Sequence, residues 1–244
     1  MTDIAELRNA ITGLLAYAGA EEEMLLATAR RSPVVSGRPD CWAAIPVIAH
    51  NTEFKRQQVR RLTAIRAGDT PPEFTEIDHR SAEVYRGYSG RPADQVARDS
   101  REVTAALIDG LGETSDEDLL DPARHPWLRG RQLGLQIIVR GFWHPLGHLG
   151  EFYAAHAQPD RAVTLSEHAT AAAAYLNAPP AAQGMAWYNL ACAQAQTQAS
   201  QADGAVGSLE QAIRLNPDLR ANARRDADLD RLRGNTEFSA LIAE

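Results

Sequence analysis

Two histidines four residues apart, His144 and His148, have the residue type and spacing best suited to chemistry in this sequence. They lie in FWHPLGHLGEF, residues 142–152, a mostly apolar stretch. Steps of three or four from Leu133 to Phe152 pass through both histidines, so on a helix both imidazoles face inward. Two imidazoles one turn apart can bind the same divalent metal ion. The spacing is equally compatible with hydrogen-bonded histidines in a core or an interface.

A third histidine, His50, lies on the inward stripe of another predicted helix, between Val47 and Phe54. A helical bundle can bring such a residue opposite the pair. Three neutral imidazoles leave a divalent ion with at least one open position for water or substrate, which is typical of catalytic sites. We therefore predict that His50, His144 and His148 are metal ligands.

Two carboxylates, Glu53 and Glu151, follow His50 and His148 by three residues and can share their helix faces. Each could be a ligand, orient an imidazole, act as a general base on water, or form a surface ion pair. Di-metal bundles place Glu before His, whereas the order here is reversed. This favours roles outside the coordination sphere.

Helices must position these residues, because apolar side chains recur at helical spacing almost throughout and strand signals are nearly absent. We predict an all-α fold whose long helices cover about residues 3–31, 40–67, 92–111 and 130–156. The two long connections between them indicate a four-helix bundle with crossing connections.

Two details of this bundle bear on a site. Pro145 interrupts the fourth helix, and Gly141, four residues earlier, gives the backbone room to relax around it. Tyr85, Tyr88 and Trp127 lie in the long connections, where they could form pocket walls or pack in a small core.

From about residue 158 the composition shifts to shorter, alanine-rich helices, so we predict two domains, residues 1–157 and 158–244. The stretch AWYNLACAQAQTQASQADGAVGSLEQAIRLNPD resembles a tetratricopeptide repeat. The matching positions are Trp187, Leu190, Ala191, Ala205, Leu209, Ala212 and Pro217. A single repeat cannot bury its apolar face alone, so we expect this segment to pack on the bundle or on another subunit.

Composition narrows the class of protein. The 25 Lys+Arg against 32 Asp+Glu give a net charge of -7, which disfavours nucleic-acid binding. The basic residues of the second predicted helix have acidic or amide neighbours, as on a solvated helix face; they are Lys55, Arg56, Arg60 and Arg61. Four further histidines are expected in loops or on polar faces: His79, His125, His156 and His168.

The expected location is the cytoplasm, with no membrane partner. No apolar run approaches the roughly 18 residues needed to cross a bilayer, and the N-terminal residues lack the layout of a signal peptide. Cys41 and Cys192 are far apart and neither belongs to a CxxC pair, so neither a disulfide framework nor a thiolate zinc site is indicated.

A bundle with one histidine in its second helix and HxxxH in its fourth resembles the DinB/YfiT-like superfamily of metal-dependent proteins, over about residues 1–157. The resemblance implies that His50, His144 and His148 hold a divalent ion, typically zinc or nickel. It also implies a homodimer, and for some members a transferase or isomerase reaction that uses a low-molecular-weight thiol such as mycothiol, bacillithiol or glutathione. Pro145 within HxxxH departs from the family pattern.

The first functional hypothesis is a metal-dependent transferase or hydrolase acting on a small-molecule substrate, in which the ion activates water or a diffusing thiol. The alternative is a non-catalytic scaffold that recruits a protein partner through the tetratricopeptide-like segment. A third reading is a purely structural histidine cluster. Replacing His148 separates them: an enzyme loses metal and activity but keeps its fold, a scaffold is indifferent, and a structural cluster loses stability.

Overall fold

The computed structural model describes residues 4–28, 43–73, 87, 90–197 and 202–243. Every secondary-structure element within these ranges is helical, which confirms the predicted all-α class. The residues form two compact units, Met1–His148 and Leu149–Glu244, so the division falls somewhat before the predicted boundary at residue 157. Four residues named above lie outside the described ranges: Cys41, His79, Tyr85 and Tyr88.

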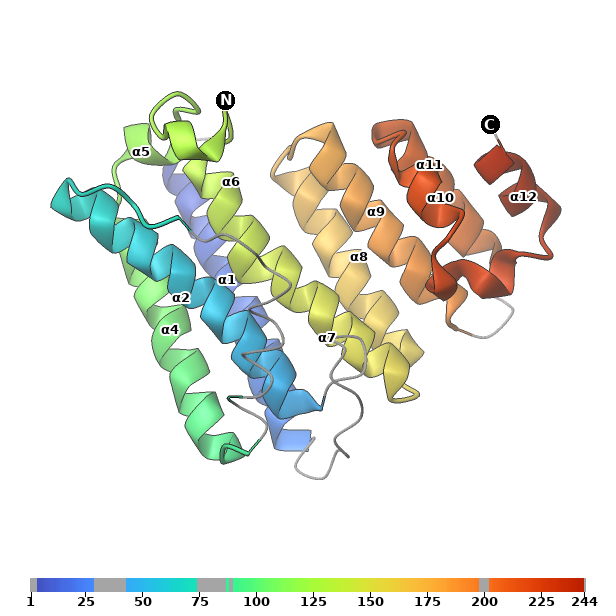
Figure 1. Ribbon diagram of the computed structural model, residues 1–244, viewed down its shortest axis with the longest axis horizontal. Coiled ribbons are helices and arrows are strands. Elements are labelled where there is room, and N and C mark those ends of the chain that lie inside the picture. The colour runs from blue at the N-terminus through green and yellow to red at the C-terminus, as the bar shows by residue number, and fades with distance from the viewer. Residues whose placement is uncertain (1–3, 29–42, 74–86, 88–89, 198–201, 244) are drawn as a thin grey trace. The chain divides into compact units, whose positions relative to one another are not determined.

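The first unit contains the long helices that the sequence predicts. In chain order its elements are α1 (Ile4–Thr28), α2 (Ala44–Ala67), α4 (Ala93–Glu113), α5 (Asp116–Leu120), η2 (Pro126–Leu128), α6 (Leu133–Ile138), η3 (Val139–Trp143) and the start of α7 (His144–Ala155). The last three follow one another without a break and form a single helical rod (Figure 1).

Apolar stripes at helical spacing hold this unit together. The inward residues include Ile11, Leu15, Val47, Phe54, Leu62, Val96, Leu107, Leu111, Leu133, Ile137 and Phe142, all almost fully buried. α1 packs against α2, α4 and η3, and α2 packs against α4 and η3. The inner face of α2 is therefore directed at the same part of the rod that leads into His144 and His148.

A buried ion pair links three of these helices and corrects one prediction. Lys55 on α2 is completely buried, not part of a solvated face. Its Nζ donates to Glu22 Oε2 of α1 at 2.7 Å and to Thr104 Oγ1 of α4 at 2.9 Å. Ser100 Oγ, also on α4, donates to the same carboxylate oxygen at 2.6 Å. The sequence offered no sign of this arrangement, because the acidic partner is distant along the chain.

The irregularity that Pro145 predicts is present as the π-helical segment η3, immediately before the first histidine of the pair. The N–H of His144 donates to the carbonyl of Val139, five residues earlier. Gly141 within η3 lacks a side chain for a packing reason: an added Cβ would overlap Leu15 and lie 3.1 Å from Leu107 Cδ2. Glycine therefore allows α1 and α4 to approach the rod closely, beyond any relief it gives to the proline.

The second unit has its own core. Its helices are the end of α7, α8 (Pro159–Tyr175), α9 (Pro180–Ala195), α10 (Ala202–Leu215), α11 (Leu219–Ala223), η5 (Ala227–Leu232) and α12 (Thr236–Ala243). α9 packs against both α8 and α10. The core between α9, α10 and the following elements includes Tyr188, Leu209 and Phe238. Within the described residues, none of the helices combines the length and apolarity needed to cross a membrane.

Candidate metal centre

Three histidines from two elements of the first unit lie together, and we call them the histidine triad: His50, His144 and His148. His50 occupies the inward face of α2, one turn before the buried Phe54. His144 and His148 are one turn apart at the start of α7, directly after the π-helical segment. The sequence predicted this grouping from the two stripes, and the structure brings all three residues together.

The Nε2 atoms converge on one point. His50 Nε2 lies 3.1 Å from His148 Nε2 and 3.1 Å from His144 Nε2. Ligand atoms about 2.0–2.1 Å from a tetrahedral zinc ion are about 3.3–3.4 Å from one another. The two spacings from His50 are close to that value, and ligand atoms of all three histidines lie within 4.8 Å of one another, so the group could hold a small divalent ion.

Hydrogen bonding among the imidazoles alone does not explain this arrangement. A neutral imidazole has one N–H group, and each ring nitrogen has either that proton or one lone pair in the ring plane. If His50 Nε2 carries the proton, it can donate to only one of its two neighbours; if it does not, two donors compete for one lone pair. A cation at the centre satisfies three lone pairs at once.

The surroundings keep the imidazoles of His50 and His144 neutral. Burial, followed by the charges of His148 and Arg140, lowers the pKa of His50 to about 3. Burial is also the main reason why the pKa of His144 is well below 6.5, with smaller contributions from the charges of His148, His50 and Arg140. Neutral imidazole is the form that binds metal ions.

Aromatic packing fixes the rings. The centroid of Phe54 lies 4.7 Å from that of His50 and 4.4 Å from that of His144. The guanidinium of Arg140 lies 5.0 Å from the centroid of the same phenyl ring. No sequence motif marks Arg140. Its position four residues before His144 nevertheless places it on the same face of the rod.

The two carboxylates do not join the triad. Glu53 is partly buried, and it pairs with Arg56 at 3.0 Å and Arg60 at 3.7 Å on its own helix. Glu151 is exposed in the second unit, where its charge contributes to raising the pKa of the Cys192 thiol. The ligand group formed by the histidine triad contains neither residue.

The chain matches no protein-family model, no curated protein and no solved structure. Its function is therefore inferred from the chemistry of its own residues.

A second group of metal-binding side chains, Cys192, Asp226 and Asp228, lies in the second unit. Asp226 accepts a hydrogen bond from the Tyr188 hydroxyl at 2.8 Å and caps η5 through the Asp228 N–H. Burial and the nearby carboxylates raise the pKa of the Cys192 thiol well above 9. These contacts give Asp226 a structural role and keep the thiol protonated.

The remaining histidines differ from one another. His125, expected to be solvated, is buried, and its Nε2 lies 3.1 Å from the carbonyl oxygen of Asp118. His156 Nδ1 lies 2.7 Å from the carbonyl oxygen of Phe152, and His168 is exposed as predicted. None of the three belongs to the histidine triad.

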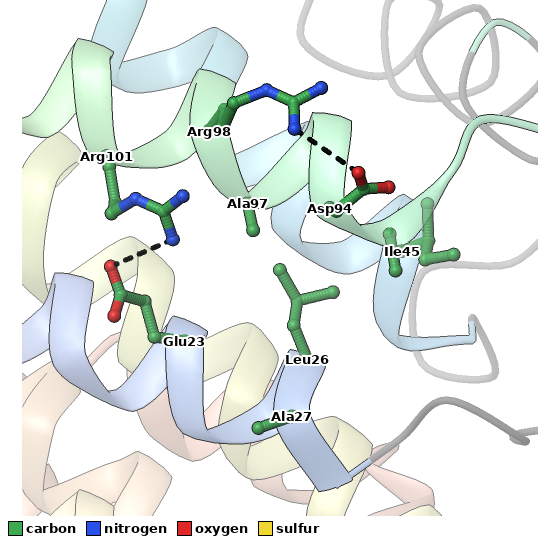
Figure 2. A pocket seen from close by; sticks show the side chains of 9 residues that line it. Glu23, Leu26, Ala27, Ile45, Asp94, Ala97, Arg98 and Arg101 are labelled. Atoms are coloured by element: carbon green, nitrogen blue, oxygen red, sulfur yellow. Dashed lines mark hydrogen bonds and ion pairs between the residues drawn. The ribbon is translucent and has the colours of Figure 1, made fainter.

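A separate cavity of about 750 Å³ opens between α1, α2 and α4 (Figure 2). Its charged lining residues are paired with one another: Arg98 with Asp94 at 3.2 Å, and Arg101 with Glu23 at 3.6 Å. Leucine and alanine side chains of α1 and α4 form much of the remaining wall. Because each arginine already has a carboxylate partner, this cavity offers less to a charged ligand than the surroundings of the histidine triad.

Proposed function

We propose that the chain is a divalent-metal-dependent enzyme of the DinB-like type, with the ion held by His50, His144 and His148. The observation that carries the proposal is the gathering of three histidines whose ligand atoms lie within 4.8 Å of one another, with His50 Nε2 at 3.1 Å from both other Nε2 atoms. The resemblance in histidine placement adds support. Zinc or nickel is the proposed ion, since imidazole ligands suit both.

A bound ion with three protein ligands would provide Lewis acidity and lower the pKa of water or of a thiol at its open position. The chain's own residues prepare the site. Phe54 packs on two of the imidazoles and restricts their rotation. Burial keeps His50 and His144 in the neutral form, so neither requires deprotonation before binding a metal at neutral pH.

The proposed reaction is of the transferase or hydrolase type on a small-molecule substrate. Cys192 is a poor candidate for the reactive thiol, because it is buried and its pKa is raised, and no sequence motif marks Cys41 for that role. A thiol-dependent reaction would therefore use a diffusing thiol. Glu53, held by two arginines, is proposed as a positioning residue rather than a base.

The scaffold alternative has weaker support. The tetratricopeptide-like helices α9 and α10 bury much of their apolar surface against each other and the following elements of the second unit. A single helix pair covered in this way leaves little concave groove for a peptide.

Elemental analysis by mass spectrometry of the untagged, full-length protein tests the proposal. After incubation with zinc or nickel and removal of excess ion, the parent is expected to retain about one ion per chain. His148→Ala should lose most of it while keeping a helical circular dichroism spectrum. His168→Ala, which removes an exposed histidine, is the matched control and should bind as the parent does. A parent that stays free of metal after incubation with zinc, nickel and manganese would overturn the proposal.

A further inference from the structure

Three arginines of the first unit interact electrostatically with one another, and we call them the arginine cluster: Arg61, Arg131 and Arg140. Of the three, Arg140 also acts on His50 and His144 of the histidine triad. Arg61 is on α2, Arg140 is in η3, and Arg131 precedes α6. Arg61 and Arg140 are partly buried and Arg131 is exposed, so the cluster extends from the interior to solvent. Burial lowers the pKa of Arg61 to about 10, with further contributions from the charges of Arg140 and Arg131.

Two members of the arginine cluster, Arg131 and Arg140, lack a carboxylate partner among the described residues. Elsewhere on α2, Arg56 and Arg60 pair with Glu53. Within the described part of the chain, by contrast, neither Arg131 nor Arg140 forms an ion pair with an acidic side chain. Arg131 donates to a backbone carbonyl at 3.1 Å, and Arg140 lies over the Phe54 ring. Partly burying the Arg140 guanidinium without a carboxylate partner among the described residues is unfavourable, so this position favours a negatively charged ligand.

Two neutral groups beside the cluster have donors with no acceptor among the described residues. Gln58, which is 1% exposed, accepts a hydrogen bond from Arg61 at 3.4 Å, but its buried Nε2 donates to nothing. The buried indole Nε1 of Trp127 also lacks an acceptor, and the Arg61 guanidinium lies 4.7 Å from the centre of its ring. Unmet donors beside positive charges suit a ligand with several acceptor atoms.

We propose that the arginine cluster and the Gln58 amide bind the anionic group, a carboxylate or a phosphate, of a small organic substrate whose reacting end reaches the histidine triad. The placement follows from Phe54, whose ring lies against both the Arg140 guanidinium and the His50 and His144 imidazoles. Anion binding is independent of the metal, whereas its assignment to a substrate rests on the proposed enzymatic function.

Calorimetric titration of the full-length, metal-stripped protein with inorganic phosphate, and separately with succinate, tests this site at constant ionic strength. The parent is expected to bind at least one of the two anions. Arg140→Gln should weaken that binding by about tenfold or more, because it removes a charged donor. Arg98→Gln removes the same charge from an exposed, carboxylate-paired arginine on α4 and should leave binding unchanged. If neither anion binds the parent at millimolar concentration, or if both variants bind as the parent does, the proposal is wrong.

Gln58→Glu is a second variant that remains informative if Arg140→Gln folds poorly. A carboxylate at this position would lie within reach of Arg61 and act as a built-in anion. We expect a higher melting temperature than the parent and loss of phosphate or succinate binding. A lower melting temperature is expected for a carboxylate buried without cations. That result would contradict the proposal that positive charge and unmet hydrogen-bond donors surround position 58.

The titrations and the metal analysis test the two proposals independently. Anion binding without metal binding would preserve the anion site and defeat the enzyme proposal. Metal binding without anion binding would preserve the enzyme proposal and defeat the anion site.

Discussion

The residues around Cys192 determine the protonation state of its thiol. The thiol is largely buried, and its sulfur lies 3.8 Å from Asp226 Oδ2. The same carboxylate oxygen accepts the Tyr188 hydroxyl. Burial is the largest cause of the raised thiol pKa, and the carboxylates add to it. Since the thiolate is the nucleophile, this cysteine is held in its unreactive form.

We therefore expect Cys192 to be inert toward Ellman's reagent at pH 8 in the folded protein and to react rapidly in guanidinium. The measurement uses Cys41→Ser, which leaves Cys192 as the single thiol, because the chain contains 2 cysteines. Adding Asp226→Asn should raise the native rate only slightly, because burial outweighs the carboxylate charge. Rapid labelling of the folded protein would contradict this account.

At the scale of single residues, sequence could predict the grouping of the three histidines but not their polar neighbours. His50, His144 and His148 lie on apolar stripes, and a stripe specifies which way a side chain points. Lys55 was misplaced because its partner Glu22 is on another helix, and no local pattern encodes a pairing between helices. Gln58 lies four residues after Phe54 on the same face of α2, but its unmet donor depends on packing between helices.

The long helices of the first unit are tied together by a polar contact as well as by apolar packing. Lys55 and Glu22 side chains are both 0% exposed, and hydroxyl groups of α4 complete the network. A buried pair is not necessarily more stabilising than apolar residues of equal size. It is nonetheless intolerant of losing one member, because the other charge then remains buried alone.

Lys55→Met is expected to lower the free energy of unfolding by about 3–5 kcal/mol, because it leaves the Glu22 carboxylate without its cation. The double variant Glu22→Leu with Lys55→Met should recover much of that loss. Guanidinium denaturation followed by circular dichroism measures both. Arg98→Ala breaks an exposed ion pair on α4 and should change stability by less than about 1 kcal/mol. Equal effects of Lys55→Met and Arg98→Ala would show that the buried pair has no special role.

At the scale of elements, the sequence predicts the long helices within a few residues because their apolar stripes extend over several turns. It predicts a disturbance at Pro145 but not its form. A π-helical turn arises from the balance of packing around Gly141, where Leu15 and Leu107 approach the backbone, and that balance depends on helices distant in sequence.

The whole molecule consists of two units, each with a core of its own, joined through α7. The first holds the histidine triad, the arginine cluster and the buried Lys55–Glu22 pair. The second holds the Tyr188–Asp226 contact. Because each unit has its own core, a ligand that binds one unit is expected to stabilise that unit more than the other.

Zinc at about 100 times its dissociation constant should stabilise the site-bearing unit by about 2.7 kcal/mol. Hydrogen exchange measured by mass spectrometry should then show greater protection in α2, α6 and the start of α7 than in α9 and α10. His148→Ala should abolish the difference. Equal gains in protection across both units would show that they unfold as one cooperative body.

The π-helical turn has a consequence for how such a site can arise or be lost. Its hydrogen bond from His144 to Val139 spans one residue more than an α-helical turn. One residue corresponds to about 100° of rotation around a helix axis. Deleting one residue of this turn would therefore rotate the downstream pair of imidazoles by about 100° around the helix axis and away from its present direction.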